Sequence, residues 1–151
     1  MPNRVLQSPP RSTSLLERLR QRSWRLTPQR RVVAEALDGE HVHLTADEVY
    51  ARAVRRLPEI ARATVYNTLN ELAAIGEVRE VALGPGPKRY DPETVRPHQH
   101  LICERCGAMR DVYPLGETQL ALPESQRHGF ILGRVDVVFW GLCAHCSARK
   151  P

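Results

Sequence analysis

The chain has 151 residues, of which 42% are hydrophobic and 26% are charged, and it carries four cysteines. This composition excludes wholesale disorder, and no apolar run approaches the roughly 20 residues that a membrane-spanning helix needs. The first 14 residues contain no apolar stretch typical of a signal peptide, so we expect a cytoplasmic protein. Thiols stay reduced in that compartment, which favours a metal site over disulfides.

The net positive charge lies entirely in the first part of the sequence. Residues 1–90 contain 15 Lys and Arg against 10 Asp and Glu, whereas residues 91–151 contain seven of each and all four cysteines. A basic region fits a polyanion such as DNA, although a solvated surface has the same composition. We therefore expect a loose tail at 1–12, a basic domain at 13–90 and a cysteine-containing domain at 91–151.

Helix-start signals recur in the basic domain. Thr27 followed by Pro28 is a capping residue before a proline at the first helical position. Thr45 and Glu48 form a capping box, and the helix that they start is expected to reach about Leu57. A short Arg-rich helix with an apolar face comes before these two.

A fourth helix is expected from about Arg62, ending at Gly76. Residues 78–83 and 88–90 then predict two short strands around the Gly/Pro turn at 84–87. Helices followed by a basic hairpin indicate a winged helix-turn-helix, for which the alternative is an ordinary small helical domain. The candidate contacts to double-stranded DNA are Arg62, Thr64, Tyr66 and Asn67 on the helix and Lys88 and Arg89 on the wing.

The remainder predicts a small α/β unit, which makes the whole chain α+β. Strands are expected at 98–103 and 109–113, a short helix at 115–122 before Pro123, and a strand pair at 129–141 that turns near Gly133. A unit of about 50 residues is marginal alone and usually needs a metal or a partner chain.

The four cysteines form two pairs, each with two residues between its members. Two such knuckles offer one ion a closed tetrahedron of sulfur ligands, which suits structural zinc. Two disulfides or buried thiols are the alternatives. The predicted zinc ligands are Cys103, Cys106, Cys143 and Cys146.

Histidines and carboxylates flank the first knuckle. His98 and His100 point to the same side of a strand, with Asp91 before them and Asp111 after them. If His43 joins these four side chains, the mixed nitrogen and oxygen ligands suit Fe(II), Mn(II), Co(II), Ni(II) or zinc. Such an ion would connect the basic domain to the second domain, so metal binding and DNA binding would strengthen each other.

Five segments resemble the ferric-uptake-regulator family of metal-dependent repressors: 26–30, 45–50, 63–69, 98–107 and 141–146. The resemblance covers residues 15–147. It implies a homodimer with an amino-terminal winged helix and a carboxy-terminal dimerisation domain. It matches the four cysteines to structural Zn(II) ligands. It matches the regulatory metal ligands to His43, Asp91, His98, His100 and Asp111.

Two positions make the chain similar to the peroxide-sensing branch of that family. It has Asn67 and Asp111 at positions where the family's uptake repressors often have Arg and Glu, respectively. This similarity implies Fe(II) or Mn(II) as the regulatory ion. It also implies that hydrogen peroxide oxidises His43 and His98 when iron is bound. His41 is a competing ligand candidate, but His43 directly precedes the motif at 44–47. His128 and His145 receive no role.

Three other functions remain open at this point. One is a family repressor that responds to the supply of iron, manganese, nickel or zinc. Another is a non-haem iron enzyme, because two histidines and a carboxylate can hold Fe(II); no cofactor motif, phosphate loop or HExxH pattern supports it. The last is a structural zinc module that binds only protein.

Overall fold

The computed structural model describes residues 13–83, 86–116 and 120–149. These residues form two compact units, which are described separately here. The first contains residues 13–82 and Lys88–Arg96, and the second contains residues 97–149 with the described part of the 83–87 loop. Among the described residues, no helix is both long enough and apolar enough to cross a membrane.

Four helices make up most of the first unit, and their starts follow the local signals in the sequence. Thr27 accepts the Arg30 backbone N–H in front of Pro28, and Thr45 forms a complete capping box with Glu48. Ser14 forms a second capping box. The helices are α1 (Leu15–Gln21), α2 (Pro28–Ala36), α3 (Ala46–Ala53) and α4 (Arg62–Ala74).

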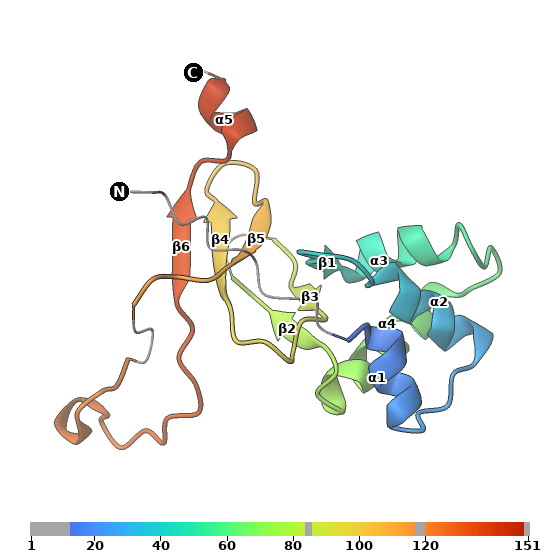
Figure 1. The fold of residues 1–151 in the computed structure, drawn as a ribbon, viewed down its shortest axis with the longest axis horizontal. Coiled ribbons are helices and arrows are strands. Elements are labelled where there is room, and N and C mark those ends of the chain that lie inside the picture. Colours follow the sequence, from blue (N-terminus) through green and yellow to red (C-terminus); the bar gives the residue numbers. More distant parts are fainter. Residues whose placement is uncertain (1–12, 84–85, 117–119, 150–151) are drawn as a thin grey trace, which may run out of the picture. The chain divides into compact units, whose positions relative to one another are not determined.

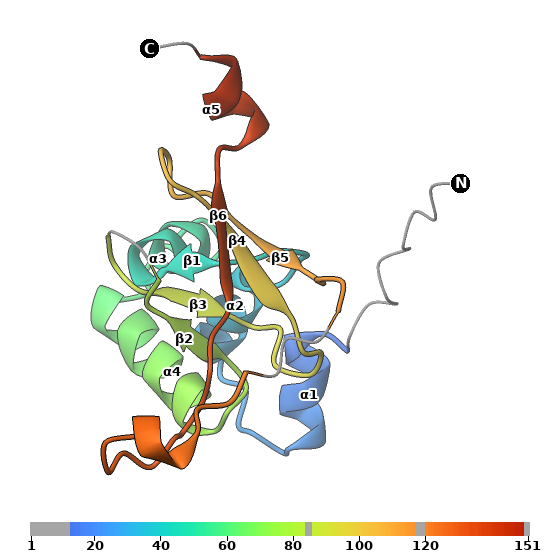
Figure 2. The same ribbon diagram turned by 90° about the vertical axis from the view of Figure 1, so that its left-hand side faces the viewer.

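A small antiparallel sheet completes the first unit. Its strands are β1 (Leu44–Thr45), β2 (Arg79–Val81) and β3 (Arg89–Asp91), in the order β1-β3-β2. Figure 2 shows these strands in that order, one beneath the other. Strands β2 and β3 are the predicted hairpin, and residues 84–85 of its turn lie outside the described residues.

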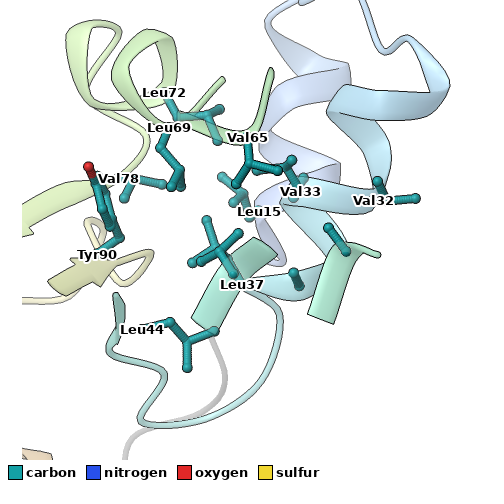
Figure 3. Close-up of a cluster of buried hydrophobic side chains, with 14 of the residues drawn as sticks. Leu15, Val32, Val33, Leu37, Leu44, Val65, Leu69, Leu72, Val78 and Tyr90 are labelled. Atoms are coloured by element: carbon teal, nitrogen blue, oxygen red, sulfur yellow. The ribbon is translucent and has the colours of Figure 1, made fainter. Parts of the chain in front are cut away.

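The hydrophobic core of the first unit lies between the helices and this sheet. Val65, Leu69 and Leu72 repeat at helical spacing on α4 and are fully buried. They meet residues from α1 and α2 and the ring of Tyr90 on β3 (Figure 3). The helix-turn-helix and the wing therefore share one core, which holds α4 in place relative to β3.

The second unit is built on a three-stranded sheet in the order β5-β4-β6 (Figure 1). Strands β4 and β5 are antiparallel, whereas β4 and β6 are parallel. No residue of this unit belongs to the described core cluster. The elements are β4 (Gln99–Cys103), β5 (Met109–Val112), the short 3-10 helix η1 (Glu124–Gln126), β6 (Val138–Gly141) and α5 (Ala144–Ala148).

The α+β class and the winged helix are confirmed, but three predicted elements are wrong. The described residues of 115–122 form no helix, and residues 117–119 lie outside the described part; the only helical turn nearby is η1, just after Pro123. Residues 130–137 pair with no described strand, so only the last part of the predicted strand pair exists. The third helix ends at Ala53, before Leu57.

Candidate metal centres and nucleic-acid interface

Strand pairing brings the two cysteine knuckles together in the second unit. Cys103 ends β4 and lies beside Gly141, the last residue of the parallel strand β6. Cys143 follows that strand and caps α5, where its sulfur accepts the backbone N–H of Cys146 at 3.4 Å. The backbone N–H of Cys143 donates to the sulfur of Cys103, also at 3.4 Å. Cysteines 37 or more residues apart thus meet at one end of the sheet.

The four sulfur atoms have the spacing of a tetrahedral metal site. All lie within 4.8 Å of one another, and those of Cys106 and Cys143 are 3.8 Å apart. Ligands in a tetrahedron with zinc–sulfur bonds of about 2.3 Å are themselves about 3.8 Å apart. The four sulfur atoms are therefore close enough together to bind one zinc ion.

The thiols of this cluster differ in acidity. Backbone N–H groups, first that of Cys143 and then that of Cys106, lower the pKa of Cys103 to about 6. Burial, followed by hydrogen bonds that the S–H of Cys146 donates to the other three sulfurs, raises the pKa of Cys146 to about 12. Four thiolates this close repel one another, so only a bound cation can keep all four deprotonated near neutral pH.

In the first unit, His43 and Asp91 lie opposite each other because of strand register. Leu44 pairs with Tyr90 across β1 and β3, which makes His43 and Asp91 the next cross-strand pair. The Nε2 of His43 lies 3.9 Å from Oδ2 of Asp91, and both side chains are buried. We call this pair the first half-site.

Hydrogen bonds orient both members of the first half-site. The Nδ1 of His43 lies 3.2 Å from the carbonyl oxygen of His41, which can only accept, so Nδ1 carries the proton and Nε2 can bind a metal. The Oδ1 of Asp91 accepts the Glu93 backbone N–H at 2.8 Å. His41 itself is exposed, which favours His43 as the ligand.

In the second unit, His98, His100 and Asp111 form a second half-site. His100 pairs directly with Asp111 across β4 and β5, and His98 lies two residues before it on the same face. Oδ1 of Asp111 is 3.4 Å from Nε2 of His98 and 3.8 Å from Nε2 of His100. Both imidazoles are buried. Two nitrogen ligands and one carboxylate at these distances can hold a divalent transition metal.

The candidate nucleic-acid contacts on α4 share one exposed surface. Tyr66 and Asn67 are exposed, as is Arg62, whereas Thr64 is half-buried. Arg62 forms an ion pair with Asp47 of α3 and lies 4.4 Å above the ring of Tyr50.

Sequence reasoning assigned no role to Asp47, which also accepts the Tyr66 hydroxyl at 3.1 Å. This carboxylate therefore orients two of the predicted contact residues. Its only sequence signal is its position beside the capping box of α3.

The two wing residues differ in environment. Lys88 is exposed and donates to Glu80 at 2.7 Å, and this bond raises the pKa of the lysine. Arg89 is half-buried, and its guanidinium donates to the carbonyl oxygen of His43 at 2.8 Å and to Glu48 at 3.1 Å. Arg89 thus also supports the first half-site, a role that the sequence did not indicate.

The helices α2 to α4 and the β2–β3 wing define a winged-helix protein, which also carries clusters of cysteine, histidine and aspartate that could hold metal ions. The sequence model of the Ferric uptake regulator family matches residues 21–137. The chain belongs to this family. Its members are metal-dependent transcriptional regulators, so the chain is a regulator and not an enzyme.

The proteins to which the chain is similar include a peroxide-responsive repressor, a transcriptional regulator and a manganese uptake regulator. The peroxide-responsive repressor PerR of Staphylococcus aureus is 36% identical over 133 residues, covering 87% of this chain and 88% of that protein. The transcriptional regulator FurA of Mycobacterium tuberculosis is 34% identical over 132 residues, with 87% and 88% covered. A solved structure, a zinc-bound manganese uptake regulator, has 27% identity and a TM-score of 0.64, covering 87% of this chain and 99% of its own.

Proposed function

We propose that the protein is a homodimeric repressor that acts on operator DNA in the cytoplasm and releases it when hydrogen peroxide oxidises the protein. The observation that carries this proposal is the pair of half-sites. The first unit contributes His43, just before β1, and Asp91, the last residue of β3. The second unit contributes His98, just before β4, with His100 on β4 and Asp111 on β5. One divalent ion that takes ligands from both units makes DNA binding depend on the metal.

The four cysteines are the proposed structural Zn(II) ligands. Support comes from the 3.8 Å spacing of the Cys106 and Cys143 sulfurs and from the shared end of β4 and β6. Four sulfur ligands complete the coordination of zinc, so this ion has no open position for a substrate. Its role is to hold the knuckles of the second unit together.

A second copy of the chain is the proposed partner of the second unit. Large apolar side chains are exposed there, with Ile131 98% and Phe130 75% accessible. Exposed apolar surface of this kind marks an interaction site. The other large apolar residues exposed in this unit are Leu101, Tyr113, Leu115, Leu120, Leu122, Leu132, Val135, Phe139, Trp140 and Leu142.

The regulatory ion is proposed to be Fe(II) or Mn(II), held by His43 and Asp91 of one unit and by His98, His100 and Asp111 of the other. A donor set of nitrogen and oxygen atoms suits either ion. When bound, Fe(II) would supply the redox chemistry that cleaves the O–O bond of peroxide, and in the net reaction both electrons come from the imidazole. The net change puts one peroxide oxygen into an imidazole C–H bond and releases one water, so peroxide is reduced and the imidazole oxidised by two electrons.

Oxidation of His43 or His98 would remove a nitrogen ligand from one half-site. Manganese does not supply this chemistry.

Peroxide treatment of the Fe(II)-loaded protein should therefore add one oxygen to peptides containing His43 or His98, and DNA affinity should fall. The Mn(II)-loaded protein is the control and should keep both its mass and its DNA affinity. Mass spectrometry and a DNA-binding assay on the same samples measure the two effects. Unmodified histidines in the iron form would contradict peroxide sensing.

A repressor that senses metal supply is the second candidate. It is favoured by the similarity to a manganese uptake regulator. It predicts that DNA affinity follows the concentration of one metal and that peroxide has no effect on the iron form.

We expect residues on the outward face of α4 to determine which operator sequences the protein prefers. Asn67 is exposed in the first half of the helix, where side chains of a recognition helix reach base edges. Asn67→Arg should change the ranking of operator variants, because one bidentate base contact discriminates by about 1–3 kcal/mol. Ala74→Arg adds the same charge at the exposed far end of the helix and should leave the ranking unchanged. An unchanged ranking for Asn67→Arg in competition binding would place the base contacts elsewhere.

A further inference from the structure

The side chain of Arg18, on α1, is part-buried and makes hydrogen bonds through all three of its nitrogen atoms. Its Nε donates to Oε2 of Glu77 at 2.7 Å, and its NH1 donates to the carbonyl oxygen of Thr13 at 2.8 Å. Its NH2 donates to two further carbonyl oxygens, those of Glu77 at 3.1 Å and Pro92 at 2.8 Å. The side chains of Arg18 and Glu77 are only 11% and 10% exposed.

One of these bonds reaches the turn that orients Asp91. Pro92 directly follows Asp91, and its carbonyl oxygen also accepts the Thr94 backbone N–H at 3.1 Å. The same turn contains the bond from the Glu93 backbone N–H to Oδ1 of Asp91. Arg18 therefore holds the backbone on which the carboxylate of the first half-site is oriented.

The other bonds reach the end of the proposed recognition helix. Glu77 lies three residues after the last residue of α4, and Arg22 contacts its carboxylate at 3.1 Å. Arg22 also donates to the carbonyl oxygen of Ile75, the C-cap of α4, at 2.7 Å. Arg22, the C-cap of α1, thus satisfies a carbonyl group at the negative end of the α4 dipole, and Arg18 bonds the segment that follows.

We propose that Arg18 is a positioning residue that connects occupancy of the regulatory metal site to α4, acting through the carbonyl of Pro92 on one side and Glu77 on the other. This inference rests on the proposed role of Asp91 as a metal ligand. Every contact in the connection lies within the first unit. Lysine cannot replace this arginine, because a single ammonium cannot reach separate acceptors in the fixed geometry of a guanidinium.

The test uses the full-length, zinc-loaded protein and Mn(II) alone as the probe. Arg18→Lys should weaken Mn(II) binding at least ten-fold in a metal titration. In the parent protein, Mn(II) should slow amide hydrogen exchange at residues 75–78, which include no candidate ligand. Arg18→Lys should abolish that slowing, whereas a purely structural arginine would change exchange equally with and without Mn(II). Arg20→Lys, at an exposed position on the same helix, is the control and should behave as the parent.

Mn(II) affinity within two-fold of the parent, with the same exchange response, would overturn the role of Arg18. If Arg18→Lys does not fold, Glu77→Gln replaces it: the Pro92 contact stays, and the exchange response at residues 75–78 should still be lost. A preserved response in Glu77→Gln would equally overturn the inference. Failure of the proposed function gives a different result, because Mn(II) would then bind the parent and Asp91→Asn with equal affinity.

Discussion

Cys143→Ser should lose its zinc and leave the second unit unfolded at room temperature. The sulfur of Cys143 lies 3.8 Å from that of Cys106 and accepts the backbone N–H of Cys146 at 3.4 Å, so the substitution removes one of the four proposed zinc ligands. Little else holds this unit together, because it has few buried apolar residues. Those in its described part are Ile102, Cys103, Met109 and Cys146. Zinc in comparable small sites contributes roughly 10–16 kcal/mol. Metal analysis and circular dichroism of the purified variant measure both effects.

The control for this variant is His145→Ala, within the same knuckle. His145 is exposed and lies outside the cluster of four sulfurs, so this variant should keep one zinc per chain and its thermal stability. A Cys143→Ser protein that retains zinc and folds normally would contradict the structural role of the ion.

Asp111→Asn should abolish metal-dependent DNA binding without unfolding the protein. The carboxylate faces both His98 and His100, and asparagine keeps its shape while removing its charge. We expect affinity for Mn(II) to fall by at least about 100-fold, because altering even the residues behind metal ligands costs 10–100-fold. By reciprocity, metal should then no longer strengthen DNA binding. Calorimetric titration with Mn(II) and a DNA-binding assay test the two consequences.

Asp136→Asn makes the same chemical change at an exposed residue of the second unit, where the carboxylate pairs with Arg134. Metal affinity and DNA binding of that control should match the parent. An Asp111→Asn variant that still shows metal-dependent DNA binding would exclude Asp111 from the regulatory site.

Local chemistry explains why the first unit could be predicted in such detail. The caps at Thr27 and Thr45 act over three residues, and the apolar repeat of α4 acts over one turn, so the sequence alone reveals them. The cysteine knuckles are equally local. The sequence does not show which distant segments pair with each other. Strand β1 has only two residues, yet its register with β3 places His43 opposite Asp91.

The failed predictions lie where tertiary contacts decide the structure. Val135 and Val137 alternate with Asp136 as in a strand, but the described part of the chain offers residues 130–137 no strand to pair with. A strand needs such a partner to satisfy its backbone groups. The role of Arg18 is not evident from the sequence either, because a basic residue on a basic helix is normally solvated. Only the fold brings Glu77 and Pro92 within hydrogen-bonding distance of it.

Diffraction from crystals of the Mn(II)-loaded protein bound to DNA, recorded at the manganese absorption edge, tests most directly whether one ion joins the two half-sites. We expect a single manganese peak per chain, bonded to His43 and Asp91 and also to His98, His100 and Asp111. A peak coordinated by only one of these groups, or two separate peaks, would show that the ion does not connect the winged helix to the second unit.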